Sequence, residues 1–244
     1  MSNLKRLFIA ASIAFALPSV ASAADLPEYI PEPYVAPEGG WYLRGDIGFK
    51  IYADPAARTT YNNIGDFWGE SLDNTALVGA GVGYYFNSWF RADMTVDYEF
   101  KSGYDGRARC VTACGTSAYS TEKANLDAWS FMLNAYADLG TVHGFTPYLG
   151  AGIGVSYLRA TDIRFNNGNG LTGKYDDHGR FNLAWALMAG TTYEVTPNLM
   201  IDAGYQFRSL GKAKSGRIYG TKNRIEYEDI YAHEMRVGMR YNFN

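Results

Sequence analysis

The stretch His233–Phe243, HEMRVGMRYNF, alternates between two kinds of side chain. From its second residue on, even positions are polar or glycine and odd positions are apolar: Glu234, Arg236, Gly238, Arg240 and Asn242 against Met235, Val237, Met239, Tyr241 and Phe243. A period of two sends successive side chains to opposite faces of a β-strand. This stretch therefore predicts a strand with one oily face and one charged face.

Upstream segments repeat this alternation and are predicted as seven further strands: 41–51, 77–86, 90–99, 127–139, 149–157, 183–195 and 199–208. The connections alternate between long, polar ones (54–73, 101–125, 160–180, 209–229) and short ones (87–88, 140–145, 196–198). An antiparallel barrel places alternate connections at opposite rims, and outer-membrane barrels have short periplasmic turns and long external loops. We therefore predict an all-β fold, an eight-stranded antiparallel up-and-down transmembrane barrel with four long external loops.

The polar faces of these strands carry charges of both signs: Arg44, Asp46, Lys50, Arg91, Asp93, Asp97, Glu99, Asp138, Glu194, Asp202, Arg208, Glu234, Arg236 and Arg240. We predict that they line the lumen and neutralise one another, because a buried charge without a partner costs several kcal/mol. About eight strands enclose an interior that side chains can just fill. Inward glycines at 79–83 and 150–154 would leave room for the longer groups. Acid–base catalysis by the carboxylates, and a soluble lipocalin-like barrel with the two faces exchanged, are the alternatives.

Aromatic residues gather near both ends of the predicted strands, as they do at membrane interfaces. Near the short turns lie Trp41, Phe86, Trp89, Tyr193 and Phe243, and near the long loops lie Tyr52, Tyr98, Trp129, Tyr157, Trp185 and Phe207. This distribution favours lipid, rather than a packed core, as the surroundings of the oily face.

The N-terminus begins with Lys5 and Arg6, followed by an apolar run and a small-residue site that ends at Ala23, the plan of a secretory signal peptide. A membrane anchor is the alternative, although the run is short for a span. Removing this segment leaves 20 cationic and 25 acidic residues, a net charge of 20 − 25 = −5, which does not suggest nucleic-acid binding. The predicted parts are a signal peptide (1–23), a proline-rich periplasmic lead (24–40), extended rather than partner-binding, and the barrel (41–244).

Cys110 and Cys114 lie close together in a polar, glycine-containing stretch. In an exported chain this spacing favours a small disulfide, and a metal site is the alternative. His143, His178 and His233 are scattered, without metal-ligand spacing or a nucleophile pattern around them. We predict no enzymatic activity, no cofactor and no metal.

The first predicted strand, WYLRGDIG at 41–48, and the last, RVGMRYNF at 236–243, follow an export signal and a proline-rich lead. Together they resemble the small outer-membrane barrel proteins of alphaproteobacteria, a porin-like surface-antigen family similar in architecture to OmpA and OmpX. The resemblance covers essentially the whole mature chain. It implies residence in the outer membrane of a Gram-negative bacterium, contact with outer-membrane lipid and lipopolysaccharide, and recognition of the last strand and its aromatic Phe243 by the barrel-insertion machinery.

Three hypotheses for function follow. The first is a non-enzymatic barrel that contributes to envelope integrity and displays external loops, with a possible surface ligand on those loops. The second is a narrow pore or a small-ligand barrel; the family resemblance implies haemin as one such ligand, and Tyr175 and His178 are the residues considered for it here. The third is an adhesin that uses the basic fourth loop: Lys212, Lys214, Arg217, Lys222 and Arg224.

Overall fold

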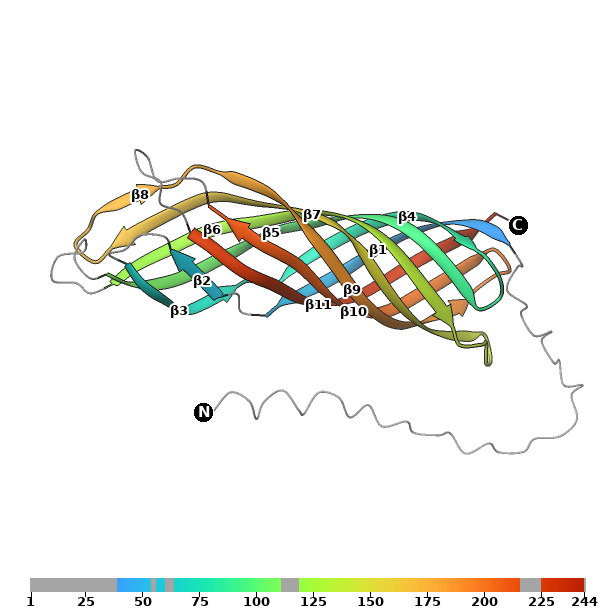
Figure 1. The fold of residues 1–244 in the computed structure, drawn as a ribbon. Coiled ribbons are helices and arrows are strands. Elements are labelled where there is room, and N and C mark those ends of the chain that lie inside the picture. The colour runs from blue at the N-terminus through green and yellow to red at the C-terminus, as the bar shows by residue number, and fades with distance from the viewer. Residues whose placement is uncertain (1–38, 54–55, 60–63, 111–118, 216–224, 244) are drawn as a thin grey trace, which may run out of the picture. The chain divides into compact units, whose positions relative to one another are not determined.

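The computed structural model describes residues 39–53, 56–59, 64–110, 119–215 and 225–243 (Figure 1). The predicted signal peptide, nearly all of the proline-rich lead, and Cys114 lie outside these residues. The disulfide and the division of the N-terminus therefore stay predictions. All described residues belong to one of two compact units, Pro33–Asn244.

Every regular element described is a β-strand, and among the described residues no helix is long and apolar enough to cross a membrane. The strands are β1 (Gly40–Tyr52), β2 (Ala56–Thr59), β3 (Ile64–Leu72), β4 (Thr75–Tyr85), β5 (Phe90–Cys110), β6 (Tyr119–Asp138), β7 (Phe145–Asn167), β8 (Thr172–Lys174), β9 (His178–Glu194), β10 (Leu199–Lys214) and β11 (Ile225–Asn242).

The long strands form a closed antiparallel ring. Its order is β1-β4-β5-β6-β7-β9-β10-β11, and β11 pairs back onto β1 from Tyr42↔Asn242 to Tyr52↔Ala232. The short strands β2, β3 and β8 pair with β11, β5 and β7 outside this order. The predicted all-β antiparallel barrel is confirmed, and the ring contains eight of the described strands.

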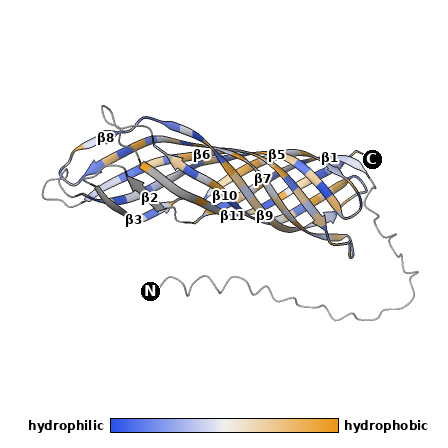
Figure 2. Cartoon of the chain, in the orientation of Figure 1, coloured by the Kyte–Doolittle hydropathy of each residue, from blue (hydrophilic) through white to orange (hydrophobic). Residues whose placement is uncertain are grey.

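The predicted orientation of the faces is confirmed along the ring. Ile47, Met94 and Met235 are 66%, 65% and 60% exposed, although each is strongly hydrophobic, while the charged residues beside them are buried. Figure 2 shows hydrophobic positions distributed over the ring and hydrophilic ones gathered towards the end that carries β3 and β8. Because water does not favour an oily surface of this extent, the belt of outward apolar residues marks the part that lies in lipid.

Most of the predicted long loops are in fact strand. β5 and β6 continue through much of 101–125, β7 and β9 through much of 160–180, and β10 and β11 through parts of 209–229. The prediction was wrong because charged residues were read as loop signals, whereas Asp105, Lys123 and Arg164 lie on the outer face of paired strands. At ~3.3 Å per residue and a tilt of about 45°, the 21 residues of β5 reach about 49 Å, roughly twice the ~25 Å apolar band of such barrels.

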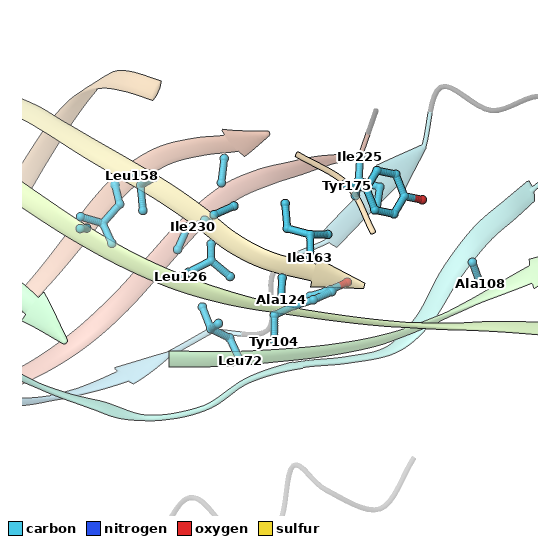
Figure 3. Packing of buried hydrophobic residues seen from close by; sticks show 14 residues of the cluster. Leu72, Tyr104, Ala108, Ala124, Leu126, Leu158, Ile163, Tyr175, Ile225 and Ile230 are labelled. Carbon is cyan, nitrogen blue, oxygen red and sulfur yellow. The ribbon is translucent and has the colours of Figure 1, made fainter. Parts of the chain in front are cut away.

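We call the part of the ring beyond the apolar belt the extension; it comprises Ser102–Cys110, Tyr119–Leu126, Thr161–Asn167 and Leu210–Lys214, with β2, β3 and β8. Its polarity is that of a water-soluble protein. The interior holds a hydrophobic cluster that includes Tyr104, Leu126, Leu158, Ile163 and Ile230 (Figure 3). Its outer face is polar, so the extension is built to stand in water.

Irregular pairing marks the level at which the polarity changes. The register shifts between Glu99 and Ser102 on β5 and around Gly211 on β10, and Asp162 on β7 adopts φ 51°. On β5 the inward residues have odd numbers up to Glu99 and even numbers from Ser102 on. A β-bulge has this effect, because it inserts one extra residue into the strand. Tyr52, predicted in the outer aromatic girdle, instead turns inward and packs under the hydrophobic cluster.

Candidate functional site

The interior at the level of the apolar belt is filled by ion pairs, and Arg236 on β11 is the centre of the upper group. Its Nη1 lies 2.7 Å from Asp46 Oδ1 and 2.9 Å from Asp97 Oδ1, and its Nη2 lies 2.7 Å from Glu234 Oε2. These contacts join β1, β5 and β11. One guanidinium thus satisfies three carboxylates through its fixed fork of donors.

Lys50 and Arg208 complete the upper group. Lys50 Nζ lies 2.5 Å from Glu99 Oε1 and 2.8 Å from Glu234 Oε1, and all three side chains are fully buried. Arg208 Nη2 lies 2.6 Å from Asp97 Oδ2. Each cation in this group therefore meets at least one carboxylate from a different strand.

The lower group lies nearer the short turns and combines ion pairs with aromatic rings. Arg44 bridges Asp46 and Asp93 at 3.1 Å each. Arg91 pairs with Asp138 at 3.1 Å and lies 4.0 Å from the ring centroid of Tyr136. A further pair in this group is Arg240–Asp202 at 2.7 Å. The aromatic rings give these cations a second favourable surface.

Inward glycines make the room that these long side chains need. A Cβ at Gly79 would overlap the carboxylate of Asp97, and one at Gly83 would overlap the ring of Tyr42. A Cβ at Gly152 would overlap the amide of Asn134, which donates to Asp93 Oδ1 at 2.8 Å. The glycines therefore determine which side chains can fill the bore.

Glu194 is the one predicted member of the charge network that the structure does not bring into an ion pair among the described residues. It faces inward by register, opposite Met200, but it is the last residue of β9 and is only partly buried. Its position at the rim explains the difference, because a carboxylate that reaches water needs no protein partner. The other thirteen predicted residues lie together as described above.

One small cavity lies inside the described part of the lumen. A cavity lined by Arg44, Tyr136, Asp202 and Arg236 has a volume of about 20 Å³, the room of a single water molecule. Above the upper group, the Tyr52 hydroxyl donates to Glu99 Oε2 at 3.2 Å, and the hydrophobic cluster of the extension follows. No cluster of residues suited to a metal ion occurs in the described part of the chain.

The sequence reasoning missed a buried carboxyl in the extension. Glu122 on β6 is 1% exposed within the hydrophobic interior, and the Tyr175 hydroxyl donates to its Oε1 at 3.3 Å. Its Oε2 has no hydrogen-bond partner among the described residues. Burial raises the pKa of Glu122 to about 8, against the smaller opposing effect of the Tyr175 hydrogen bond. The available signal was the period of two: if Ala124 faces the interior of a strand and Lys123 faces outward, Glu122 must face inward as well.

The two residues considered for haemin do not face one site. Tyr175 is 6% exposed and its hydroxyl is engaged by Glu122, while His178 is exposed at the start of β9. Of the fourth-loop cations, Lys212 is exposed, and the side chains of Lys214, Arg217, Lys222 and Arg224 lie outside the described residues.

A closed antiparallel ring with an oily outer belt and paired charges in its bore is the arrangement of an integral outer-membrane β-barrel. The sequence profile of the family described as "Outer membrane protein beta-barrel domain" matches residues 8–243, and the chain belongs to this family. The protein is thus an integral protein of the Gram-negative outer membrane. The predicted family resemblance is confirmed.

Relatives match along nearly the whole chain. An uncharacterised protein of Brucella melitensis is 30% identical, over 92% of this chain and 93% of its own length. A Rickettsia bellii protein named "Putative adhesin" is 27% identical, over 98% and 99%.

Solved structures are similar to this chain at lower identity. Neisserial surface protein A is 20% identical with a TM-score of 0.49, over 84% of this chain and 97% of that one. OprG from Pseudomonas aeruginosa is 14% identical with a TM-score of 0.47, over 86% and 98%.

Replacing Lys50 with Met should strongly destabilise the barrel. The substitution leaves Glu99 and Glu234 buried without their shared cation, and breaking a buried ion pair by removing one partner costs about 3–5 kcal/mol. The measurement is the free energy of unfolding in urea, in phosphocholine vesicles. Lys101→Met, an exposed lysine just beyond the belt, is the control and should change it by less than about 0.5 kcal/mol. Equal effects of the two substitutions would contradict the buried network.

The extension should become less stable as the pH rises from about 4.5 to about 8. Because folding raises the pKa of Glu122, the native state holds a proton that the unfolded state releases in this window, so stability is fully present below it and lost through it. The measurement is amide hydrogen exchange of β6 at pH 5 and pH 9, corrected for the intrinsic exchange rate.

Glu122→Gln should abolish this pH dependence, since the amide stays neutral at both pH values. The matched control is Asp105→Asn, which removes an exposed carboxylate from the neighbouring strand and should leave the wild-type dependence intact. Identical pH profiles for wild type and Glu122→Gln would contradict the assignment.

Proposed function

We propose that this protein is a non-enzymatic, non-conducting barrel that contributes to envelope integrity and displays a rigid extension at the cell surface. The observation that carries the proposal is that the interior is filled at two levels. Ion pairs occupy the bore within the apolar belt, and a hydrophobic cluster fills the extension above it. A hydrated ion would have to pass both the ion pairs and the hydrophobic cluster to cross the barrel.

The chemistry of the interior carboxylates supports a structural role. Asp46, Asp97, Glu99 and Glu234 each contact at least one cation within 3.1 Å, and all are buried. A general acid or base must reach its substrate within hydrogen-bond distance. The cavity beside Arg44, Asp46 and Arg236 has room for about one water molecule, which is too little for a substrate.

The surface of the barrel supports the partners expected of such a protein. Outward apolar residues meet lipid, and aromatic pairs such as Tyr157–Phe181 lie at the level where the belt ends. At the other end, Phe243 is 54% exposed at the end of β11, accessible to the barrel-insertion machinery.

Adhesion is the second candidate. The relative from Rickettsia bellii, which matches almost the full chain, carries an adhesin name. The extension favours such a role because paired strands present their outer residues in fixed positions, whereas a flexible loop must first be ordered, which lowers affinity.

The purified barrel should be silent in planar lipid bilayers. Because both the ion pairs and the hydrophobic cluster occupy the interior, no stepwise current is expected over long recordings at applied potentials of either sign. An open porin inserted in the same bilayers provides the positive control. Regular, reproducible openings of the wild-type protein would overturn the non-conducting barrel in favour of the pore.

An epitope inserted between Asn169 and Gly170 should be labelled by antibody on intact cells. These residues form a turn that joins β7 to β8 in the extension and are exposed. The control is the same epitope at Val142–His143, in the short turn between β6 and β7, which should be labelled only after the outer membrane is permeabilised. The reverse pattern of labelling would place the extension in the periplasm and end the display hypothesis.

A further inference from the structure

The outer face of the extension carries a row of four charged residues, three of which are neighbouring cations. Cross-strand pairing places Asp105 of β5 beside Lys123 of β6, Lys123 beside Arg164 of β7, and Arg164 beside Lys174 of β8. All four side chains are exposed. Like charges directly opposite one another destabilise a sheet, so three adjacent cations weaken the extension locally.

A second row runs parallel to the first, and its guanidinium, hydroxyl and amide groups can form hydrogen bonds. It pairs Arg107 with Thr121, Thr121 with Asn166, and Asn166 with Thr172. A third row consists of one pair, Arg109 of β5 and Tyr119 of β6, and both side chains are exposed. We call this outer surface of β5–β8 the cationic face.

Only part of this positive charge is neutralised by the protein. Lys123 Nζ lies 2.9 Å from Asp105, and Arg164 lies 4.0 Å from Asp162. No ion pair is found among the described residues for Arg107, Arg109 and Lys174. The face is therefore cationic on a chain whose net charge is negative.

The spacing on the face suits a chain of repeated anions. Neighbouring strands lie ~4.8 Å apart, and alternate residues along a strand lie ~6.8 Å apart. Arg107 and Lys123 also line a groove of about 410 Å³, together with Asp105, Thr121, Gly69 and Gly106. Hydroxyl and amide groups between the cations add donors and acceptors for sugar hydroxyls.

The distance from the membrane favours a ligand that arrives from outside. Arg107 lies seven residues beyond Phe100, the last outward aromatic residue of β5, which corresponds to about 16 Å at the tilt of such barrels. The headgroup region adds only about 5–7 Å to each side of a typical hydrocarbon core. The face therefore stands above the level that phospholipid headgroups would reach.

We propose that the cationic face of β5–β8 binds a sulfated polysaccharide chain, through Arg107, Arg109, Lys123, Arg164 and Lys174. This inference rests on the proposed display function, because it needs the extension to face the outside of the cell. It does not depend on whether the bore conducts.

The test is the affinity of the barrel, in phosphocholine nanodiscs free of lipopolysaccharide, for a fluorescent heparin octasaccharide. The variant Arg107→Ser/Lys174→Ser should weaken binding about tenfold, because it removes two of the five cations that a polyanion would contact at the same time. The control, Lys101→Ser, removes a positive charge from an exposed position outside the face and should change the affinity less than twofold. Heat-modifiable gel migration establishes that both variants are folded.

The outcomes separate the inference from the proposed function. Equal losses in the two variants would mean unspecific attraction, and no binding by wild type would also overturn the inference, whatever the bilayer recordings show. If the Arg107→Ser/Lys174→Ser variant lost binding to lipopolysaccharide vesicles but bound heparin as wild type does, the face would be a site for the membrane's own lipid. That result would also overturn the inference. Single-channel openings, by contrast, would overturn only the non-conducting barrel.

Discussion

The structure depends on one constraint: charges removed from water inside a lipid-embedded ring must meet partners there. Desolvating an ion costs several kcal/mol, and the cost is recovered only with good geometry and several hydrogen bonds. Arg236 meets this condition by contacting carboxylates of three strands, and Lys50 by contacting two. The glycines opposite them follow from the same constraint, because a guanidinium and its partners need space that a methyl group would fill.

The barrel passes from lipid into water along its length, and the polarity of its outer and inner faces changes at the same level. Within lipid the outside is apolar and the bore is ionic; beyond lipid the outside is ionic and the bore is apolar. Met94 and Arg107 lie on the outer face of the same strand, so one β-sheet serves two solvents. The register shifts after Glu99 and around Gly211 stand where the two regimes meet.

The fold was largely predictable because a period of two in eight segments admits few arrangements. The inward residues of the bore followed from the same alternation, including Arg44, Asp97 and Arg236. What could not be predicted were the partners, since register between distant strands decides that Arg236 meets Asp46 and Asp97. The extension was missed because its outer face, with residues such as Asp105, has the composition of a loop. Glu122 was missed for the same reason.

The pairing of Lys50 has a consequence for how the barrel comes together. Its two carboxylates belong to β5 and to β11, the strand that closes the ring against β1. Before that seam is made, Glu234 can meet only Arg208 and Arg236, and the pairs Lys50–Glu234 and Arg236–Asp46 cannot form. Closing the ring is therefore the step that completes the ion pairs between the first and last strands.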